Sequence, residues 1–211
     1  MRIIVGMTGA SGVIYGTTLL QALKRHGVET HLILSRQAEA LIDMETQYSI
    51  EDIRAIASYA YTENELNAPP ASGSFLHQGM VIAPCSMKTL AGIATGYAEN
   101  LIQRAADVTI KEGRKLVLLP RESPLSAIHL ENMLKLARLG VVIAPPIPAF
   151  YPQPETITDL INFSVGRILD LLGIDNHLKR WDKSLRPAND EAQTWPDRSK
   201  SACCRRPSKL R

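Results

Sequence analysis

Several features that often reveal a function are scarce or absent in this sequence. Its 211 residues include only three cysteines, Cys85, Cys203 and Cys204, with no CxxC pair and no Cys/His cluster at metal-ligand spacing. We therefore expect no disulfide framework, no metal site and a reducing, cytoplasmic setting. No apolar run approaches the roughly 18 residues that span a bilayer, and the first residues enter a strand-like run without a signal-peptide core. We expect no membrane contact.

A strong charge of either sign is also lacking from most of the chain. Residues 1–181 carry 16 Lys and Arg against 17 Asp and Glu, whereas residues 182–211 carry 8 against 4. Because the basic excess is confined to the C-terminal stretch, we expect no nucleic-acid surface on the body. Residues 182–211 are polar and lack apolar periodicity, which predicts a single domain over residues 1–181 followed by a disordered tail.

What the sequence does contain is an alternation of short apolar runs and helix-like stretches. Apolar residues at helical spacing follow the first two runs, the second such stretch reaching about residue 45, and a closing amphipathic helix covers residues 156–173. The alternation predicts a parallel sheet covered by helices on both faces, with ligands bound beyond the carboxyl ends of its strands. The five expected strands are residues 2–7, 28–35, 80–84, 115–120 and 140–146.

The turn after the first expected strand reads GMTGASG, residues 6–12, and holds Gly9, Ala10 and Ser11. Its glycine spacing is not that of the dinucleotide fingerprint GxGxxG. The glycines still permit a tight turn, and free N–H groups at a helix start attract a phosphate or another anion. A plain turn between a strand and a helix is the alternative.

After the third expected strand, APCSMKTLAG supplies the hydroxyls of Ser86 and Thr89 and the cation of Lys88. A lysine at a helix N-terminus is opposed by the helix dipole, so a bound anion would explain it. Cys85 has no evident histidine partner and is expected to be a small packed residue rather than a nucleophile.

The stretch PRESPLSAIHLENM, residues 120–133, places Arg121 and Glu122 at the exit of the fourth expected strand. Ser123 and Pro124 predict a helix start, with serine as the cap and proline in first position. A surface ion pair is one explanation for the two charges, and a ligand site is the other. Arg114 and Lys115, which precede the strand, are expected to be exposed.

Three further residues stand out by their position. Glu45 lies at the end of a helix, where the dipole disfavours a carboxylate. Tyr151 lies in a loop stiffened by prolines, and its hydroxyl suits phosphate recognition. Arg167 lies among apolar neighbours on the closing helix, where its stem could also simply cover the core.

Five segments, in order, carry a resemblance to a known family: GMTGASGVIYG, ASGSF, PCSMKTLAGIATGY, RAADVTIKEGRKLVLLPRESPLSAIHLENML and PPIPAFYPQPETITDLINFSVGRILDLLGI. They resemble the UbiX-type flavin prenyltransferases, and more narrowly the small partner proteins of phenolic-acid decarboxylase systems. The resemblance runs from about residue 2 to Trp181. It implies a Rossmann-like, flavodoxin-type three-layer α/β sandwich that forms a homo-oligomer, by resemblance a dodecamer.

The resemblance also implies a reaction, in which a dimethylallyl group passes from dimethylallyl phosphate to reduced FMN, at N5 and then at C6. The product, prenylated FMN, would serve a UbiD-type decarboxylase. Catalytic roles would fall to Glu45 as proton acceptor, Glu122 as acid, Lys111 and Ser11, and the donor would be bound by Tyr151, Arg167 and Lys111, with Tyr151 and Arg167 reaching across a subunit boundary. FMN would contact Gly9, Ala10, Ser11, Ser35, Ser86, Met87, Lys88, Thr89 and Arg121.

The chain has no aspartate-rich DDxxD motif of the kind that recruits Mg²⁺ to prenyl diphosphates. We therefore expect fixed cations and hydroxyls, without a metal, to stabilise the leaving phosphate. Two alternatives are an FMN-dependent decarboxylase of the cysteine-decarboxylase type and a non-catalytic flavin carrier. The first fits poorly because Asn132 and Met133 are followed by Leu134 rather than a tryptophan. The second would not require Lys111, Glu122, Tyr151 and Arg167 together.

Overall fold

The computed structural model describes residues 1–181, so the expected tail at 182–211 lies outside the described residues. The chain divides into two units, Met1–Lys179 and Arg180–Arg211. The first unit carries a six-stranded, wholly parallel sheet in the order β3-β2-β1-β4-β5-β6. The strands are β1 Arg2–Met7, β2 Glu29–Leu34, β3 Tyr59–Thr62, β4 Gly79–Cys85, β5 Lys115–Pro120 and β6 Val142–Ile143.

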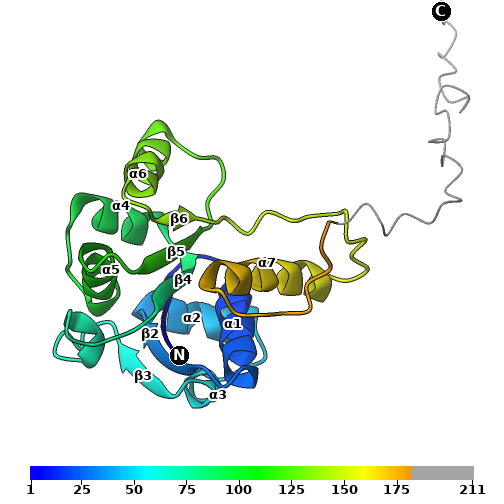
Figure 1. Cartoon of the computed structure of the whole chain (residues 1–211), viewed down its shortest axis with the longest axis horizontal. Coiled ribbons are helices and arrows are strands. Elements are labelled where there is room, and N and C mark those ends of the chain that lie inside the picture. Colours follow the sequence, from blue (N-terminus) through cyan, green and yellow to red (C-terminus); the bar gives the residue numbers. More distant parts are fainter. Residues whose placement is uncertain (182–211) are drawn as a thin grey trace, which may run out of the picture. The chain divides into compact units, whose positions relative to one another are not determined.

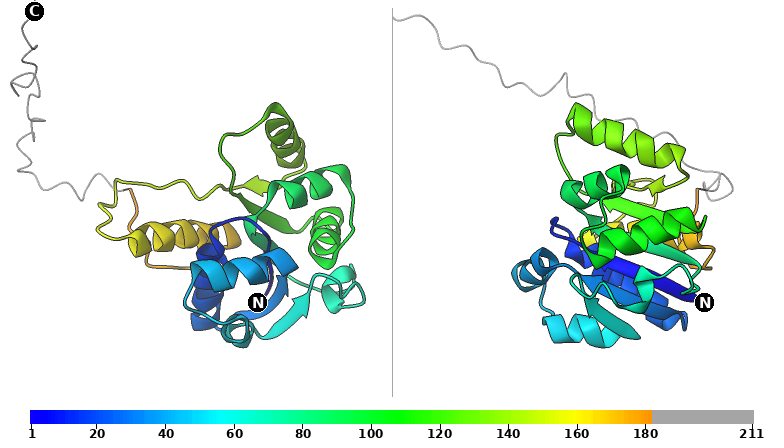
Figure 2. Two further views of the ribbon diagram at one scale, coloured as in Figure 1. Left: turned by 180° about the vertical axis from the view of Figure 1, so that it is seen from behind. Right: turned by 90° about the vertical axis from the view of Figure 1, so that its left-hand side faces the viewer.

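Helices cover both faces of this sheet, which confirms the three-layer, Rossmann-like architecture (Figures 1 and 2). α1, α2, α3 and α7 pack on one face, and α4, α5 and α6 on the other. A single 3₁₀ turn, Pro69–Ala71, lies between β3 and β4. The helices are α1 Val13–Arg25, α2 Arg36–Glu45, α3 Ile50–Ile56, α4 Met87–Thr95, α5 Leu101–Lys111, α6 Ala127–Arg138 and α7 Ile157–Leu172.

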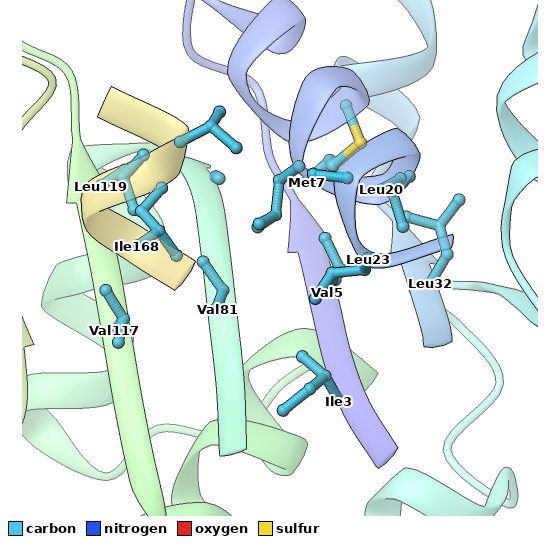
Figure 3. Packing of buried hydrophobic residues seen from close by; sticks show 14 of the residues in the cluster. Ile3, Val5, Met7, Leu20, Leu23, Leu32, Val81, Val117, Leu119 and Ile168 are labelled. Carbon is cyan, nitrogen blue, oxygen red and sulfur yellow. The ribbon is translucent and has the colours of Figure 1, made fainter. Parts of the chain in front are cut away.

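Alternation along the strands builds a separate hydrophobic core on each face. Ile3 and Val5 of β1 face α1 and α7, together with Val81 of β4 (Figure 3). Ile4 and Ile82 point to the opposite face, toward α4 and α5. All seven residues of β4 are buried, as expected for a central strand covered on both sides.

Two strand predictions need correction. β3, Tyr59–Thr62, was not predicted from the sequence; it is a short edge strand with two exposed residues and shows little apolar signal. The last strand was predicted over residues 140–146 but pairs only at Val142–Ile143. Beyond it the prolines at 145 and 146 have no N–H to donate to the ladder.

Side-chain caps begin most of the helices and explain where they start. In residues 1–181, α1 is the one α-helix without a side-chain cap from its own N-cap residue, Gly12. The other six are capped by a hydroxyl or amide oxygen that accepts a backbone N–H in the first turn. These residues are Ser35, Ser49, Ser86, Asn100, Ser126 and Thr156.

Candidate active site at the carboxyl edge of the sheet

Three loops meet where the strand order reverses, between β1 and β4. The hydroxyl of Thr8 donates to Pro84 O (2.9 Å) and accepts from Ser86 N (2.8 Å), which ties the loop after β1 to the loop after β4. Arg121, after β5, donates from its backbone to Cys85 O (3.3 Å) and from Nε to Ser11 O (3.2 Å). This is the switch point at which doubly wound sheets bind ligands. Thr8 was not singled out from the sequence.

The loop after β1 approaches α2 too closely for a side chain at position 9. A Cβ on Gly9 would lie 2.4 Å from Gln37 Cβ, and Gly12 has a φ of 102°, in the left-handed region. Ala10 is buried and Ser11 is exposed on the open side of the turn. The glycines therefore serve close packing and a sharp turn, and Ser11 is left exposed at this edge of the sheet.

Glu45 supplies the cap that α1 lacks. It is the last residue of α2, and its Oε2 accepts from the backbone N–H groups of Gly12 (2.8 Å) and Val13 (3.3 Å). A carboxylate that is unfavourable at the end of its own helix thus meets the positive end of another. The same contacts bring Glu45 to the loop that holds Ser11.

The start of α4 presents hydroxyls to the same edge. Ser86 Oγ accepts from Thr89 N (3.3 Å) and donates to Thr89 Oγ1 (3.1 Å), and Met87 between them is half-buried. Lys88 is 78% exposed and its Nζ lies 3.8 Å from Glu99 Oε2, so a protein carboxylate partly offsets its charge at this helix start. Ser35, buried at the end of β2, caps α2 through Ala38 N.

The segment after β5 corrects one helix boundary. Ser123 and Pro124 were predicted to begin the helix, but α6 begins at Ala127 and is capped by Ser126. Residues 121–126 are an exposed loop, so Arg121 and Glu122 lie outside regular structure. Glu122 accepts from Ser123 N (3.1 Å) and no ion pair joins it to Arg121 within residues 1–181. The surface-pair explanation for these two charges is therefore wrong for this part of the chain.

Tyr151 and Arg167 belong to the segment that follows β6 in the chain, outside the three loops. Residues 144–156, which we call the arm, run from β6 to the start of α7 (Figures 1 and 2). The Tyr151 ring packs edge-on against Phe163 of α7, with centroids 5.5 Å apart. Arg167 is exposed and borders an apolar recess of about 280 Å³ formed with Leu119 and the start of the arm.

Lys111 lies at the opposite edge of the sheet. It ends α5, ahead of β5, and forms an ion pair with Glu112 beside Gly73. Arg114 was expected to be exposed, but its side chain is only 14% exposed because it donates to Gly73 O and Phe75 O, both at 2.8 Å. One subunit therefore does not bring Lys111 together with Glu122.

Cys85 behaves as the packed residue that was expected. It is fully buried at the end of β4, and burial strongly raises the pKa of its thiol, which keeps it from acting as a thiolate nucleophile. In residues 1–181 no group of three or more His, Cys, Asp or Glu side chains could hold a metal ion, and no helix there is long and apolar enough to cross a membrane.

Comparison with known proteins places this architecture in a family. Residues 1–169 match the family model described as Flavoprotein. The flavin prenyltransferase LpdB of Lactiplantibacillus plantarum is 56% identical over 183 residues, covering 86% of this chain and 98% of the relative. The chain belongs to the UbiX-like flavin prenyltransferase family.

Solved structures of family members agree over the same residues. AnUbiX (PadA1), determined with FMN and dimethylallyl pyrophosphate, is 53% identical with a TM-score of 0.85, covering 86% of this chain and 97% of that one. A dodecameric FMN-dependent UbiX-like decarboxylase from Escherichia coli O157:H7 is also 53% identical with a TM-score of 0.85, covering 86% and 100%. The peptidyl-cysteine decarboxylase EpiD, at 19% identity and a TM-score of 0.55, shares the fold alone.

Proposed function

We propose that this protein transfers a dimethylallyl group from dimethylallyl phosphate to reduced FMN. The observation that carries the proposal is its 53% identity to AnUbiX, a protein solved with FMN and dimethylallyl pyrophosphate. The product would be prenylated FMN, and a UbiD-type decarboxylase in the cytoplasm would be its recipient. FMN is thus a substrate of this reaction and not a permanently bound cofactor.

The contacts at the switch point support one orientation of the flavin. Glu45 already occupies the N–H groups that begin α1, so a phosphate is expected at the start of α4 instead. There Ser86 and Thr89 offer hydroxyls, with Met87 and Lys88 beside them. The ring would then lie along Gly9, Ala10 and Ser11, close to Arg121, with Ser35 nearby.

The first chemical step forms the bond from flavin N5 to the allylic carbon while the carbon–oxygen bond to phosphate breaks. Charge builds up on the departing phosphate, and fixed cations and hydroxyls stabilise such charge without a metal. We assign this role to Lys111, Arg121, Tyr151 and Arg167. Glu122 would give a proton to the phosphate if bound donor or a second subunit buries its carboxyl group.

In the second step the alkene of the N5-bound group takes up a proton from the released phosphate, C6 bonds to the tertiary carbon so formed, and the proton on C6 is removed. Glu45 lies at the loop that would carry the flavin, which supports its assignment as proton acceptor together with the released phosphate. We propose that Ser11, exposed on the same turn, relays a proton or orients the ring. These roles are proposals for this chain.

Lys111 can join the site only if another copy presents it, because it lies at the opposite edge of its own subunit. We propose a homo-oligomer in which the α5 end of one subunit meets the flavin edge of the next; the E. coli relative is dodecameric. Mixing two impaired variants, Lys111→Ala and Glu122→Gln, should then restore part of the activity. If the mixed oligomer is no more active than the better of its two parents, Lys111 does not act across subunits.

The direct test is anaerobic incubation of the protein with reduced FMN and dimethylallyl phosphate, followed by mass analysis of the flavin. We expect the mass of a dimethylallyl adduct. Glu122→Gln should still bind FMN but slow the first adduct, whereas Glu131→Gln, an exposed carboxylate on α6, should leave the rate unchanged. An unmodified flavin would favour the carrier function and reject the transferase.

A further inference from the structure

Residues 174–179, here called the strap, fold back over α7 and are fixed largely by Asn176. The amide nitrogen of Asn176 donates to Asp170 Oδ1 (2.8 Å) and Gly166 O (3.3 Å), and its oxygen accepts from Leu178 N (3.0 Å). Leu178 packs over Gly166, where a Cβ would lie 2.9 Å from Leu178 Cδ1. One side chain thus joins the strap to the middle of the helix.

Through Asp170, the strap reaches Arg167. Asp170 Oδ2 accepts from Arg167 Nη1 (2.8 Å), while its other oxygen accepts from Asn176. The Asp170 side chain is only 17% exposed, against 56% for Arg167. The partly buried carboxylate of Asp170 therefore holds one nitrogen of the Arg167 guanidinium, while more than half of the Arg167 side chain stays exposed. The chain of contacts runs from Asn176 through Asp170 to Arg167.

The strap also reaches the arm beside Tyr151. Lys179 Nζ donates to Pro152 O (2.9 Å), the residue that follows Tyr151. The next residue, Gln153, has a φ of 58°, which residues other than glycine rarely adopt, and its N–H donates to Phe150 O (2.9 Å). Such conformations persist where surrounding contacts hold them, and they cluster at functional sites.

We propose that the strap, with Asn176 at its centre, positions Arg167 and Tyr151 as one unit for the phosphate of the prenyl donor. This inference rests on the proposed function. A long cationic side chain loses rotational freedom when it binds, so holding it in advance strengthens binding. The hydrogen bonds of the strap within residues 1–181 go to α7, to the strap itself and to the arm, and none goes to the loops after β1, β4 and β5. Its effect should therefore fall on the donor and not on FMN.

The test compares Asn176→Ala with Asn162→Ala, an exposed asparagine of α7 that makes no side-chain hydrogen bond within residues 1–181. We expect Asn176→Ala to lower kcat/KM for dimethylallyl phosphate by about tenfold, the effect of losing one well-placed hydrogen-bonded contact. The KM for reduced FMN should stay within about twofold of wild type. Asn162→Ala should change neither. In an Arg167→Ala background, Asn176→Ala should add less than about twofold, because the two residues act through one chain of contacts.

Asn176→Asp is the second variant, since it keeps the acceptor for Leu178 N but turns a carboxylate toward Asp170. It should lower donor kcat/KM at least as much as alanine. The inference is overturned if both Asn176 variants leave donor kinetics unchanged, if FMN affinity falls in parallel, or if the effect adds fully to that of Arg167→Ala. A wild-type protein that forms no prenylated flavin rejects the proposed function itself. In that case calorimetry with dimethylallyl phosphate tests the role of the strap separately. Weaker binding of dimethylallyl phosphate to Asn176→Ala than to the wild-type protein supports this role, and equal binding, or no binding to either protein, rejects it.

Discussion

Two substitutions at Glu45 should separate its structural contribution from its chemical one. Glu45→Gln keeps an oxygen that can accept from Gly12 N and Val13 N, whereas Glu45→Ala removes the acceptor. Losing an N-terminal cap costs about 0.5–2 kcal/mol of unfolding free energy. Losing only the charge at a helix N-terminus costs about 0.3–1 kcal/mol. We therefore expect alanine to destabilise the fold more than glutamine does.

The assays are urea unfolding and thermal unfolding, both followed by circular dichroism, and anaerobic turnover with reduced FMN. For a domain of this size about 1 kcal/mol corresponds to a shift of roughly 2–4 °C in Tm, which thermal unfolding resolves. Glu45→Gln should stay near wild-type stability while the singly attached N5 adduct accumulates. Asp43→Asn, an exposed carboxylate on the same helix, is the control. Wild-type stability in Glu45→Ala would refute the capping argument, and normal ring closure in Glu45→Gln would refute the proton-acceptor role.

Three further predictions address packing, pH and metals. Gly16→Ala should lower the unfolding free energy by about 1–3 kcal/mol in urea, because its Cβ would lie 2.2 Å from Ala83 O. Burial lowers the pKa of His31 below its usual value near 6.5, so below that pH the unfolded chain binds more protons than the native one. Unfolding free energy should thus fall as pH drops from about 7 to 5, and less steeply in His31→Gln. EDTA should leave turnover unchanged; its loss would contradict a metal-free site.

Local sequence signals were sufficient to predict the central strands and the helices that cover them, but not the edge strand β3 or the start of α6. Four of the five expected strands match the structure within about two residues, because continuous apolar runs are the signal of strands buried on both faces. β3 lies at the sheet edge and carries two exposed residues, so its sequence resembles a loop. The start of α6 was misplaced because two serine caps stand three residues apart, and only the later one is used.

At the site, the sequence indicated which residues stand out, but not which residues from other parts of the chain they contact. Glu45 attracted notice because its charge is unfavourable within α2, but its partners at Gly12 and Val13 could not be read from the sequence. The contact between Lys88 and Glu99 could not be read from the sequence either. The link from Asn176 through Asp170 to Arg167 likewise depends on how the chain folds back.

The location of Lys111, at the end of the sheet opposite Glu45 and Glu122, has a consequence for symmetry. Joining two different surfaces of identical chains is a heterologous contact, which does not close as a two-fold pair and instead generates a ring or an open filament. A closed ring would give every copy one complete pocket and leave no unused end. In such a ring a single damaged chain impairs two pockets, its own and that of its neighbour. When a small fraction of a Lys111→Ala, Glu122→Gln double variant is mixed into the wild-type oligomer, the loss of activity should therefore be larger than that fraction.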